Sequence, residues 1–163
     1  MFDCVIDNYQ EERDRDFIFK AFKENWNLLV DVSCWSEYSV KNVEEDLFAE
    51  NREIRVLVKS GISIGFIVYR PNNPNKYYFY SDPMSISVLF IDPLYRGNGY
   101  ANVLINYAVQ DMLKQSNKTE ITAVINEDNI SSLKTFKKAG FEIVKVQVRS
   151  GLSAHIHVSK KSI

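Results

Sequence analysis

The chain has 163 residues, about the length of one domain, so we expect a single domain over 1–163. Its 20 basic and 21 acidic residues give a formal net charge of -1, which excludes the strong basic field of a general nucleic-acid binder. Aromatic residues make up 13% of the chain, which supplies enough apolar area for a hydrophobic core.

The two cysteines, Cys4 and Cys34, are too few for a disulfide scaffold or a four-cysteine zinc site. We expect two reduced thiols, with one disulfide between them as the alternative. The first 16 residues are acidic and contain no apolar signal segment, and no apolar run approaches the roughly 20 residues of a membrane span. We therefore expect a cytoplasmic protein with no membrane partner.

The first half of the chain has the pattern of a strand, two helices and a hairpin. Residues 1–6 alternate as a strand does, and residues 11–30 repeat apolar side chains every three or four positions, as one face of a helix does. A short helix is expected to begin at Ser39, whose hydroxyl can cap a free N–H. Two further strands, over 53–59 and 62–69, are joined by the turn Ser60-Gly61.

The second half alternates strands and helices. Residues 84–91 become more apolar toward their end, as a central strand does, and the aromatic residues 77–80 are a further strand candidate. A helix over 100–115, a strand over 120–126 and a helix over 129–139 that ends at Gly140 follow. The last two strands, 141–149 and 152–159, are joined by the tight turn Ser150-Gly151. This order predicts a mixed α/β (α+β) fold.

The segment most informative about function is 89–101, LFIDPLYRGNGYA, which joins a buried strand to a helix. Such a joint leaves several backbone N–H groups free at a helix N-terminus, where anions bind. Gly97 and Gly99 omit Cβ atoms where an anion's oxygens must approach the backbone, and Arg96 adds a positive charge. The residues predict a phosphate or pyrophosphate cradle, and a strand–turn–helix joint without a ligand is the alternative.

Two motifs resemble those of the GCN5-related N-acetyltransferase (GNAT) family. Residues 96–101, RGNGYA, fit its Q/R-x-x-G-x-G/A motif, and residues 129–141, NISSLKTFKKAGF, resemble its N-x-x-A/S-x-x-x-Y-x-K-x-G-F pattern. The predicted element order also matches that family over nearly the whole chain. The resemblance implies a GNAT-like, mostly antiparallel sheet of about seven strands with about four helices. It further implies that this sheet is splayed between the strands at 84–91 and 120–126.

The resemblance implies an enzyme that moves an acetyl group from acetyl-CoA to a primary amine by direct attack in a ternary complex. It implies no metal, and it leaves open whether the acceptor is a small molecule or a peptide. The oligomeric state is also open. The CoA-binding positions that it carries over are Leu89, Phe90, Ile91, Arg96, Gly97, Asn98, Gly99, Tyr100, Ala101, Asn129, Ser132 and Phe136.

The chain departs from the family pattern at Phe136, where the family has a tyrosine that protonates the leaving thiolate. Phenylalanine has no proton to give, so we expect Phe136 to pack against CoA, while Tyr100, Tyr107 or a water takes the task. The general base is also open, since strand 84–91 has no acidic residue; the candidates are Glu37, Tyr38 and Asp82. The alternative function is therefore a non-catalytic CoA-binding or regulatory module of the same fold.

Other polar residues have mainly structural interpretations. His155 and His157 share a face of the last strand, and without a third ligand nearby we expect exposed or cross-strand-paired histidines. Asn126 is expected to end its strand. The basic face of helix 129–139 is solvated or attracts the 3′-phosphate of CoA; it consists of Lys134, Lys137 and Lys138. The acceptor is expected near residues 30–40 and the turn at Ser150-Gly151.

Overall fold

The computed structural model describes residues 4–30, 37–49, 52–71, 84–115 and 120–161. The helices are α1 (Glu11–Glu24), α2 (Trp26–Leu29), α3 (Val40–Leu47), α4 (Tyr100–Gln115) and α5 (Ile130–Lys138). The strands are β1 (Cys4–Asn8), β2 (Glu53–Lys59), β3 (Ile62–Arg70), β4 (Met84–Ile91), β5 (Glu120–Asn126), β6 (Glu142–Arg149) and β7 (Leu152–Lys161). None of the described helices is both long and apolar enough to cross a membrane.

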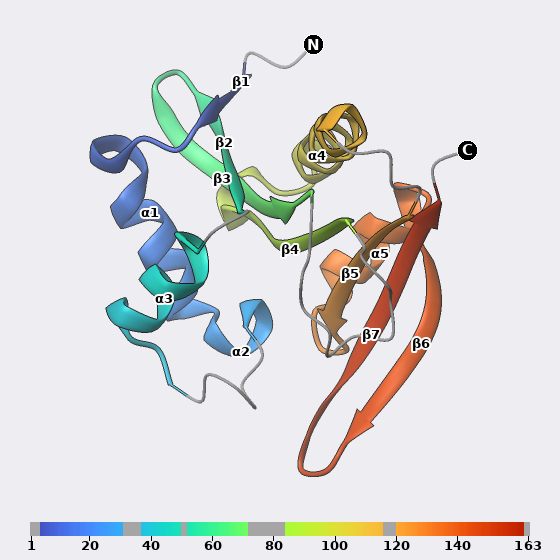
Figure 1. The fold of residues 1–163 in the computed structure, drawn as a ribbon. Coiled ribbons are helices and arrows are strands. Elements are labelled where there is room, and N and C mark those ends of the chain that lie inside the picture. Colours follow the sequence, from blue (N-terminus) through green and yellow to red (C-terminus); the bar gives the residue numbers. More distant parts are fainter. Residues whose placement is uncertain (1–3, 31–36, 50–51, 72–83, 116–119, 162–163) are drawn as a thin grey trace.

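The strands form one seven-stranded sheet in the order β1-β2-β3-β4-β5-β7-β6 (Figure 1). Every neighbouring pair is antiparallel except β4 and β5, which are parallel. The predicted mixed, mostly antiparallel sheet is therefore confirmed. The strand candidate over 77–80 and the start of the expected first strand, residues 1–3, lie outside the described residues, as does Cys34. Cys4 is a free thiol.

The helix expected over 11–30 is broken at Asn25, so the described residues contain five helices instead of about four. The side-chain amide of Asn25 donates to the carbonyl of Ala21 at 2.9 Å, and this local bond competes with continuation of the helix. The predicted helix start at Ser39 and the predicted turn at Ser60-Gly61 are confirmed. The Ser39 hydroxyl accepts the N–H of Asn42 at 3.0 Å, and Ser60-Gly61 turns β2 into β3.

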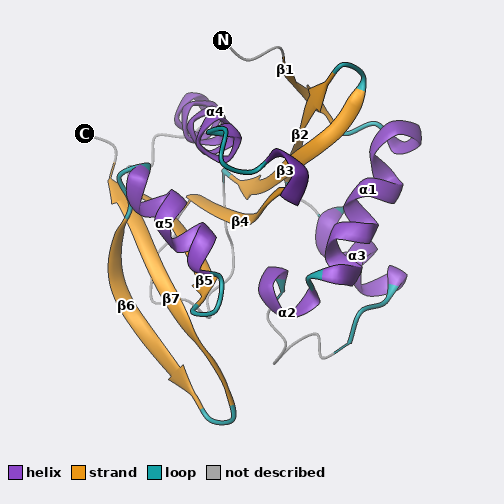
Figure 2. Ribbon diagram, turned by 180° about the vertical axis from the view of Figure 1, so that it is seen from behind, coloured by secondary structure: helices purple, strands orange, loops and turns teal. Residues whose placement is uncertain are grey.

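Helices cover both faces of the sheet (Figures 1 and 2). One hydrophobic core lies between the sheet and α4 with α5, and it includes Leu104 and Met112. The other lies between the sheet and α1, α2 and α3, and it includes Phe22, Trp26 and Leu47. Because β3 and β4 contribute to both cores, their side chains are fixed from both sides.

A β-bulge in β4 changes which core its side chains enter. Val68 of β3 pairs with Val88, and the next residue, Tyr69, pairs with Ile86, so Ser87 is the extra residue. In a regular strand Ile86 and Val88 would share a face. Instead Ile86 packs in the α4 core and Val88 packs in the α1 core.

The parallel pairing of β4 with β5 is short. Among the described residues, it consists of Met84 with Ile121, Ser85 with Thr122, and Ile86 with Ala123. The strands separate from Ser87 onward, although β4 stays paired with β3 and β5 stays paired with β7. The predicted splay between these two strands is confirmed, and it begins at the bulge.

A buried carboxylate, which the sequence analysis did not single out, ties α1 to β3. Asp14 is fully buried and accepts hydrogen bonds from the Gln10 N–H (2.8 Å), the Ser63 hydroxyl (2.6 Å) and the Arg13 guanidinium (2.7 Å). Burial alone would raise the pKa of Asp14, but these hydrogen bonds outweigh burial and lower the pKa. Asp14 is therefore ionised at neutral pH and anchors the helix.

Replacing Asp14 with asparagine is expected to destabilise the fold by about 3 kcal/mol at neutral pH, because a buried ionic partner is lost. Since the folded-state pKa is lowered, this contribution is complete above the ordinary aspartate pKa of about 4 and disappears as the pH falls through the folded value. Denaturant unfolding at several pH values should show the gap between wild type and variant shrinking on acidification.

The matched control for this prediction is Asp7→Asn, which removes the more exposed partner of Arg13. It should cause a much smaller loss, because water screens that ion pair. Equal losses in the two variants would contradict the anchoring role of Asp14.

Candidate functional site

A glycine-containing loop joins β4 to α4. After β4 the chain makes a 3-10 turn over Pro93–Tyr95. Gly97 and Gly99 then have φ values of 83° and 80°, which residues with a side chain rarely adopt. Because α4 begins at Tyr100, the first backbone N–H groups of this helix have no partner within the helix. The loop thus has the geometry of the predicted anion cradle.

Two side chains brace this loop from within. The Nε of Arg96 donates to the carbonyl of Ile91 at 2.9 Å, and its guanidinium lies 5.5 Å from the centre of the Phe90 ring. The side-chain amide of Asn98 donates to the carbonyl of Tyr95 at 3.1 Å. Arg96 therefore places its charge at the end of β4, whereas the Asn98 side chain stabilises the turn.

The second motif forms α5 and its cap. The Asn129 side chain accepts the N–H of Ser132 at 3.3 Å and so begins the helix. At the other end Gly140, with a φ of 94°, terminates α5 as predicted, and its N–H bonds to the carbonyl of Lys137 at 3.0 Å. Both ends of the helix are therefore fixed by residues of the motif.

Phe136 takes part in the same C-terminal cap. The N–H of Phe141 bonds to the Phe136 carbonyl at 3.0 Å, which together with the Gly140 bond makes a Schellman motif. The two rings pack edge to face with centres 5.1 Å apart, which is the hydrophobic contact typical of this cap. The orientation of the Phe136 ring is therefore set by the end of the helix.

A groove of about 390 Å³ runs between the two motifs. Of the twelve positions carried over from the family, all but Asn98 and Phe136 line it. The described residues that line it are Asn25, Leu28, Leu29, Leu89, Phe90, Ile91, Tyr95, Arg96, Gly97, Gly99, Tyr100, Ala101, Asn102, Asn129, Ser131, Ser132, Lys134, Thr135 and Lys138.

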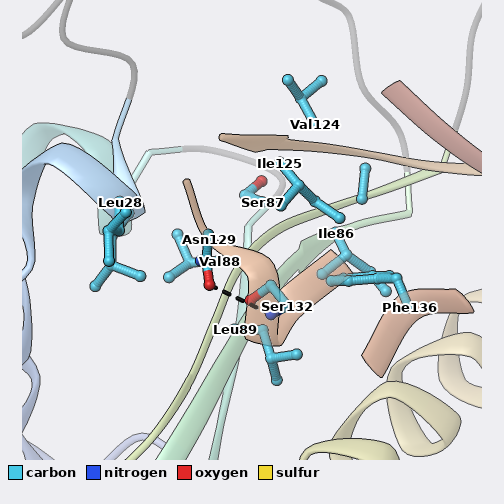
Figure 3. Close-up of a pocket in the computed structure, with 12 residues that line it drawn as sticks. Leu28, Ile86, Ser87, Val88, Leu89, Val124, Ile125, Asn129, Ser132 and Phe136 are labelled. Atoms are coloured by element: carbon cyan, nitrogen blue, oxygen red, sulfur yellow. Dashed lines mark hydrogen bonds between the residues drawn. The ribbon is translucent and has the colours of Figure 1, made fainter. Parts of the chain in front are cut away.

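A cavity of about 40 Å³ continues the groove into the gap between β4 and β5 (Figure 3). Phe136 lines this cavity from α5, and Ser87 lines it from the bulge of β4. The cavity and the groove share Leu28, Leu29, Leu89, Asn129 and Ser132. The described part of the cavity is lined by no carboxylate and no tyrosine hydroxyl.

Two lysines give the α5 wall a positive charge. Lys134 and Lys138 line the groove, whereas Lys137, the third lysine of the predicted basic face, does not. The groove thus has positive side chains on both walls, Arg96 on one and the lysines on the other.

The candidates for a catalytic acid or base are not gathered at the cavity. Glu37 is exposed at the surface, and Tyr38 packs edge to face on Trp26 with ring centres 5.7 Å apart. The Tyr100 hydroxyl accepts a hydrogen bond from the Lys59 ammonium at 3.3 Å, and Tyr100 does not line the cavity. Tyr107 lines neither the groove nor the cavity. Asp82 lies outside the described residues, as do residues 31–36 of the expected acceptor region.

The histidines were expected to be exposed or paired across the strands, and the second arrangement is found for His157. His155 and His157 are both buried, because β7 is last in the chain but lies between β5 and β6 in the sheet. His157 is paired across the strands with Gln147 at 3.1 Å, as the alternative predicted. Burial, with the charges of His155 and Lys145, lowers the pKa of His157 to about 4. The described residues contain no group of three potential metal ligands.

The sequence analysis missed the wall that the α1–α2 junction contributes, which consists of Asn25, Leu28 and Leu29. The break at Asn25 turns this segment away from the α1 axis, and recognising Asn25 as a helix breaker would have separated it from α1. Asn126 was correctly expected to be structural. Its side-chain amide donates to the Asn27 carbonyl at 3.1 Å and links the end of β5 to α2.

Comparison with known proteins identifies the family. Residues 13–141 match the acetyltransferase (GNAT) family, whose members use acetyl-CoA. The chain therefore belongs to the GNAT family of N-acetyltransferases. No curated protein matches the chain.

Several solved structures share the fold. An N-acetyltransferase from Staphylococcus aureus Mu50 superposes with a TM-score of 0.74 at 16% identity, covering 98% of this chain and 99% of that one. A spermidine N-acetyltransferase from Vibrio cholerae, in complex with CoA and spermine, gives 0.71 at 15% identity, with 98% and 96% covered. The ribosomal-protein-S18-alanine N-acetyltransferase from Escherichia coli gives 0.68 at 13% identity, with 98% and 95% covered. At these sequence identities, the similarity to the three structures establishes a shared fold.

Proposed function

We propose that this protein transfers the acetyl group of acetyl-CoA to a primary amine by direct attack in a ternary complex. The observation that carries the proposal is the continuous path from the glycine loop, along the end of β4, into the gap between β4 and β5. The acceptor is a small-molecule or peptide amine that meets the thioester in this gap. The positions carried over from the family, all but Asn98, line this path.

The chemistry of CoA matches the groove. The N–H groups at the start of α4 and the Arg96 guanidinium suit its pyrophosphate. None of the described strands pairs with the β5-facing edge of β4 beyond Ser87, so Leu89 and its neighbours have backbone groups available for the pantetheine amides. Lys134 and Lys138 suit the 3′-phosphate. Each part of the ligand thus has complementary groups in this chain.

The residues of this chain act mainly by holding the reactants and by electrostatics. Leu28 and Phe136 exclude water from the gap, and its walls hold the amine close to the thioester. Backbone N–H groups of β4 beyond the bulge polarise the acetyl carbonyl. The neutral amine nitrogen forms the new C–N bond, the C–S bond breaks, and the nitrogen loses its proton to water. The sulfur leaves as a thiolate, which is a fair leaving group because thiols have a pKa near 8.5.

The non-catalytic CoA-binding module stays as the second candidate. The specific observation in its favour is that the described lining of the cavity holds no acid or base, with phenylalanine at position 136. Amine turnover separates the two functions.

Acetyl-CoA at 100 times its dissociation constant is expected to stabilise the protein by about 2.7 kcal/mol. Thermal unfolding and calorimetry measure this, and free-thiol release measures turnover over a panel of amines, amino sugars, polyamines and peptides. Turnover with at least one amine is the expected result. The absence of both a thermal shift and heat would overturn the proposal, whereas binding without any turnover would favour the non-catalytic module.

Gly99→Val is expected to weaken CoA binding by well over tenfold, because a β-branched side chain resists the positive φ of the cradle and crowds the pyrophosphate. The matched control is Gly61→Val, since Gly61 has nearly the same φ, 79°, in the β2–β3 turn, away from the groove. Calorimetry with CoA should show a loss only for Gly99. A folded Gly99→Val variant with normal affinity would place the cradle elsewhere.

Phe136→Tyr adds a hydroxyl where the family has its acid. Because the ring is kept, we expect CoA affinity to change by only a few fold. Turnover should rise by less than about tenfold, because another step or proton donor already meets the need. Phe141→Tyr is the control, since Phe141 packs on Phe136 but does not line the cavity. A gain of a hundredfold or more would favour the non-catalytic module as the wild-type function.

A further inference from the structure

Ser87, the extra residue of the β4 bulge, is held by a buried arginine. Arg52 lies immediately before β2, and its side chain is only 8% exposed. Its Nη1 donates to the Ser87 hydroxyl at 2.9 Å, and its Nη2 donates to the Asp46 carboxylate at 2.8 Å. Asp46 belongs to α3 and lies close to Arg52 in the sequence, whereas Ser87 is distant, so the arginine connects the α3–β2 region to β4.

Ser87 lies where the hydrogen-bonded pairing of the sheet is irregular or ends. Its pairing with β3 is irregular, because it is the extra residue between the Val88 and Ile86 pairs. On the other side, the pairing of β4 with β5 ends at Ile86. The backbone at Ser87 therefore lacks a regular ladder partner on either side. The hydrogen bond from Arg52 to the Ser87 side chain is the contact that holds this part of the backbone in place.

The position of Ser87 controls the direction of the strand that follows. The bulge sends Val88 into the α1 core and leaves Leu89 lining the groove and the cavity. A relaxed bulge would restore the regular alternation and rotate this segment. Under the proposed function, it is this backbone that must point its N–H groups at the acetyl carbonyl.

We propose that Arg52 is a positioning residue for acetyl transfer: anchored on Asp46, it clamps the Ser87 hydroxyl and thereby fixes the β4 backbone that faces the acetyl group. This inference rests on the proposed function. Arg52 forms and breaks no covalent bond and exchanges no proton. The planar guanidinium of Arg52 contacts Ser87 and Asp46 at the same time. A lysine carries a point charge on a flexible side chain and does not reproduce that geometry.

Asp46 explains how a guanidinium can be buried next to the gap. An unpaired buried charge is strongly unfavourable, and the carboxylate at 2.8 Å compensates it. The pair together brings little net charge to the cavity. The contribution of Arg52 to the reaction is therefore geometric, and it should affect the chemical step more than CoA binding.

The test uses Arg52→Lys, Arg52→Met and Ser87→Ala in the full chain, with the amine that supports the fastest thiol release by the wild type. We expect each variant to lose at least about tenfold in kcat, because a displaced donor no longer stabilises the transition state. KM for acetyl-CoA and the calorimetric Kd for CoA should stay within about threefold. The double variant Arg52→Met/Ser87→Ala should be no slower than Arg52→Met, since both changes remove one contact.

Two controls separate positioning from general stability. Ser87→Thr keeps the hydroxyl and should keep most of the activity. Arg55→Met removes another largely buried arginine, which lies on β2 and pairs with Glu53 and Asp111. Arg55 lines neither the groove nor the cavity. This substitution should lower the melting temperature while leaving kcat unchanged. Should Arg52→Met fail to fold, Arg52→Lys and Ser87→Ala decide the question.

The outcomes distinguish this inference from the proposed function. A wild type that neither binds acetyl-CoA nor releases thiol overturns both. An active wild type with normal kcat in folded Arg52→Lys and Ser87→Ala variants overturns the positioning role alone. The same holds if CoA affinity falls as far as kcat, or if Arg55→Met loses as much activity as the Arg52 variants.

Discussion

Among the described residues, strands β4 and β5 are paired over three residue pairs, and the site depends on the point where they part. Parallel strands that separate expose backbone N–H and C=O groups, which are costly to leave without partners. Here those groups face a groove instead of a solid core. The two helices that follow these strands, α4 and α5, begin beside the opening, so their free N-terminal N–H groups face the same space. The separation of one strand pair thus creates both the gap and its polar walls.

Polar contacts between segments far apart in the sequence join the sheet to the helices that cover it. Asn126 links β5 to α2, Arg52 links β4 to α3, and Asp14 links α1 to β3. Each contact uses a polar side chain at an irregular point of the backbone: a strand end, a bulge or a helix start. The apolar cores fix the layers, and these polar contacts join the layers at irregular points of the backbone.

The regular elements and the cofactor motifs could be predicted, because local signals determine them. Glycines at positive φ, a serine cap and apolar periodicity depend on neighbouring residues, so Gly99, Ser39 and β4 were all identified. The bulge at Ser87 and the burial of His157 depend on which strands become neighbours in the sheet. No local pattern carries that information. The α1–α2 wall was missed for a third reason, since apolar spacing continued across the break at Asn25.

The cap of α5 has a consequence for how this site can change over time. The Phe136 ring serves the Schellman contact with Phe141 on one side and lines the cavity on the other. The helix end uses the apolar contact of this ring with Phe141, and the cavity meets another part of the same ring. Tyrosine would keep that ring contact and differ from phenylalanine by a single oxygen. A single substitution at this position can therefore add or remove a proton donor at the site. The catalytic groups can change in this way while the fold stays the same.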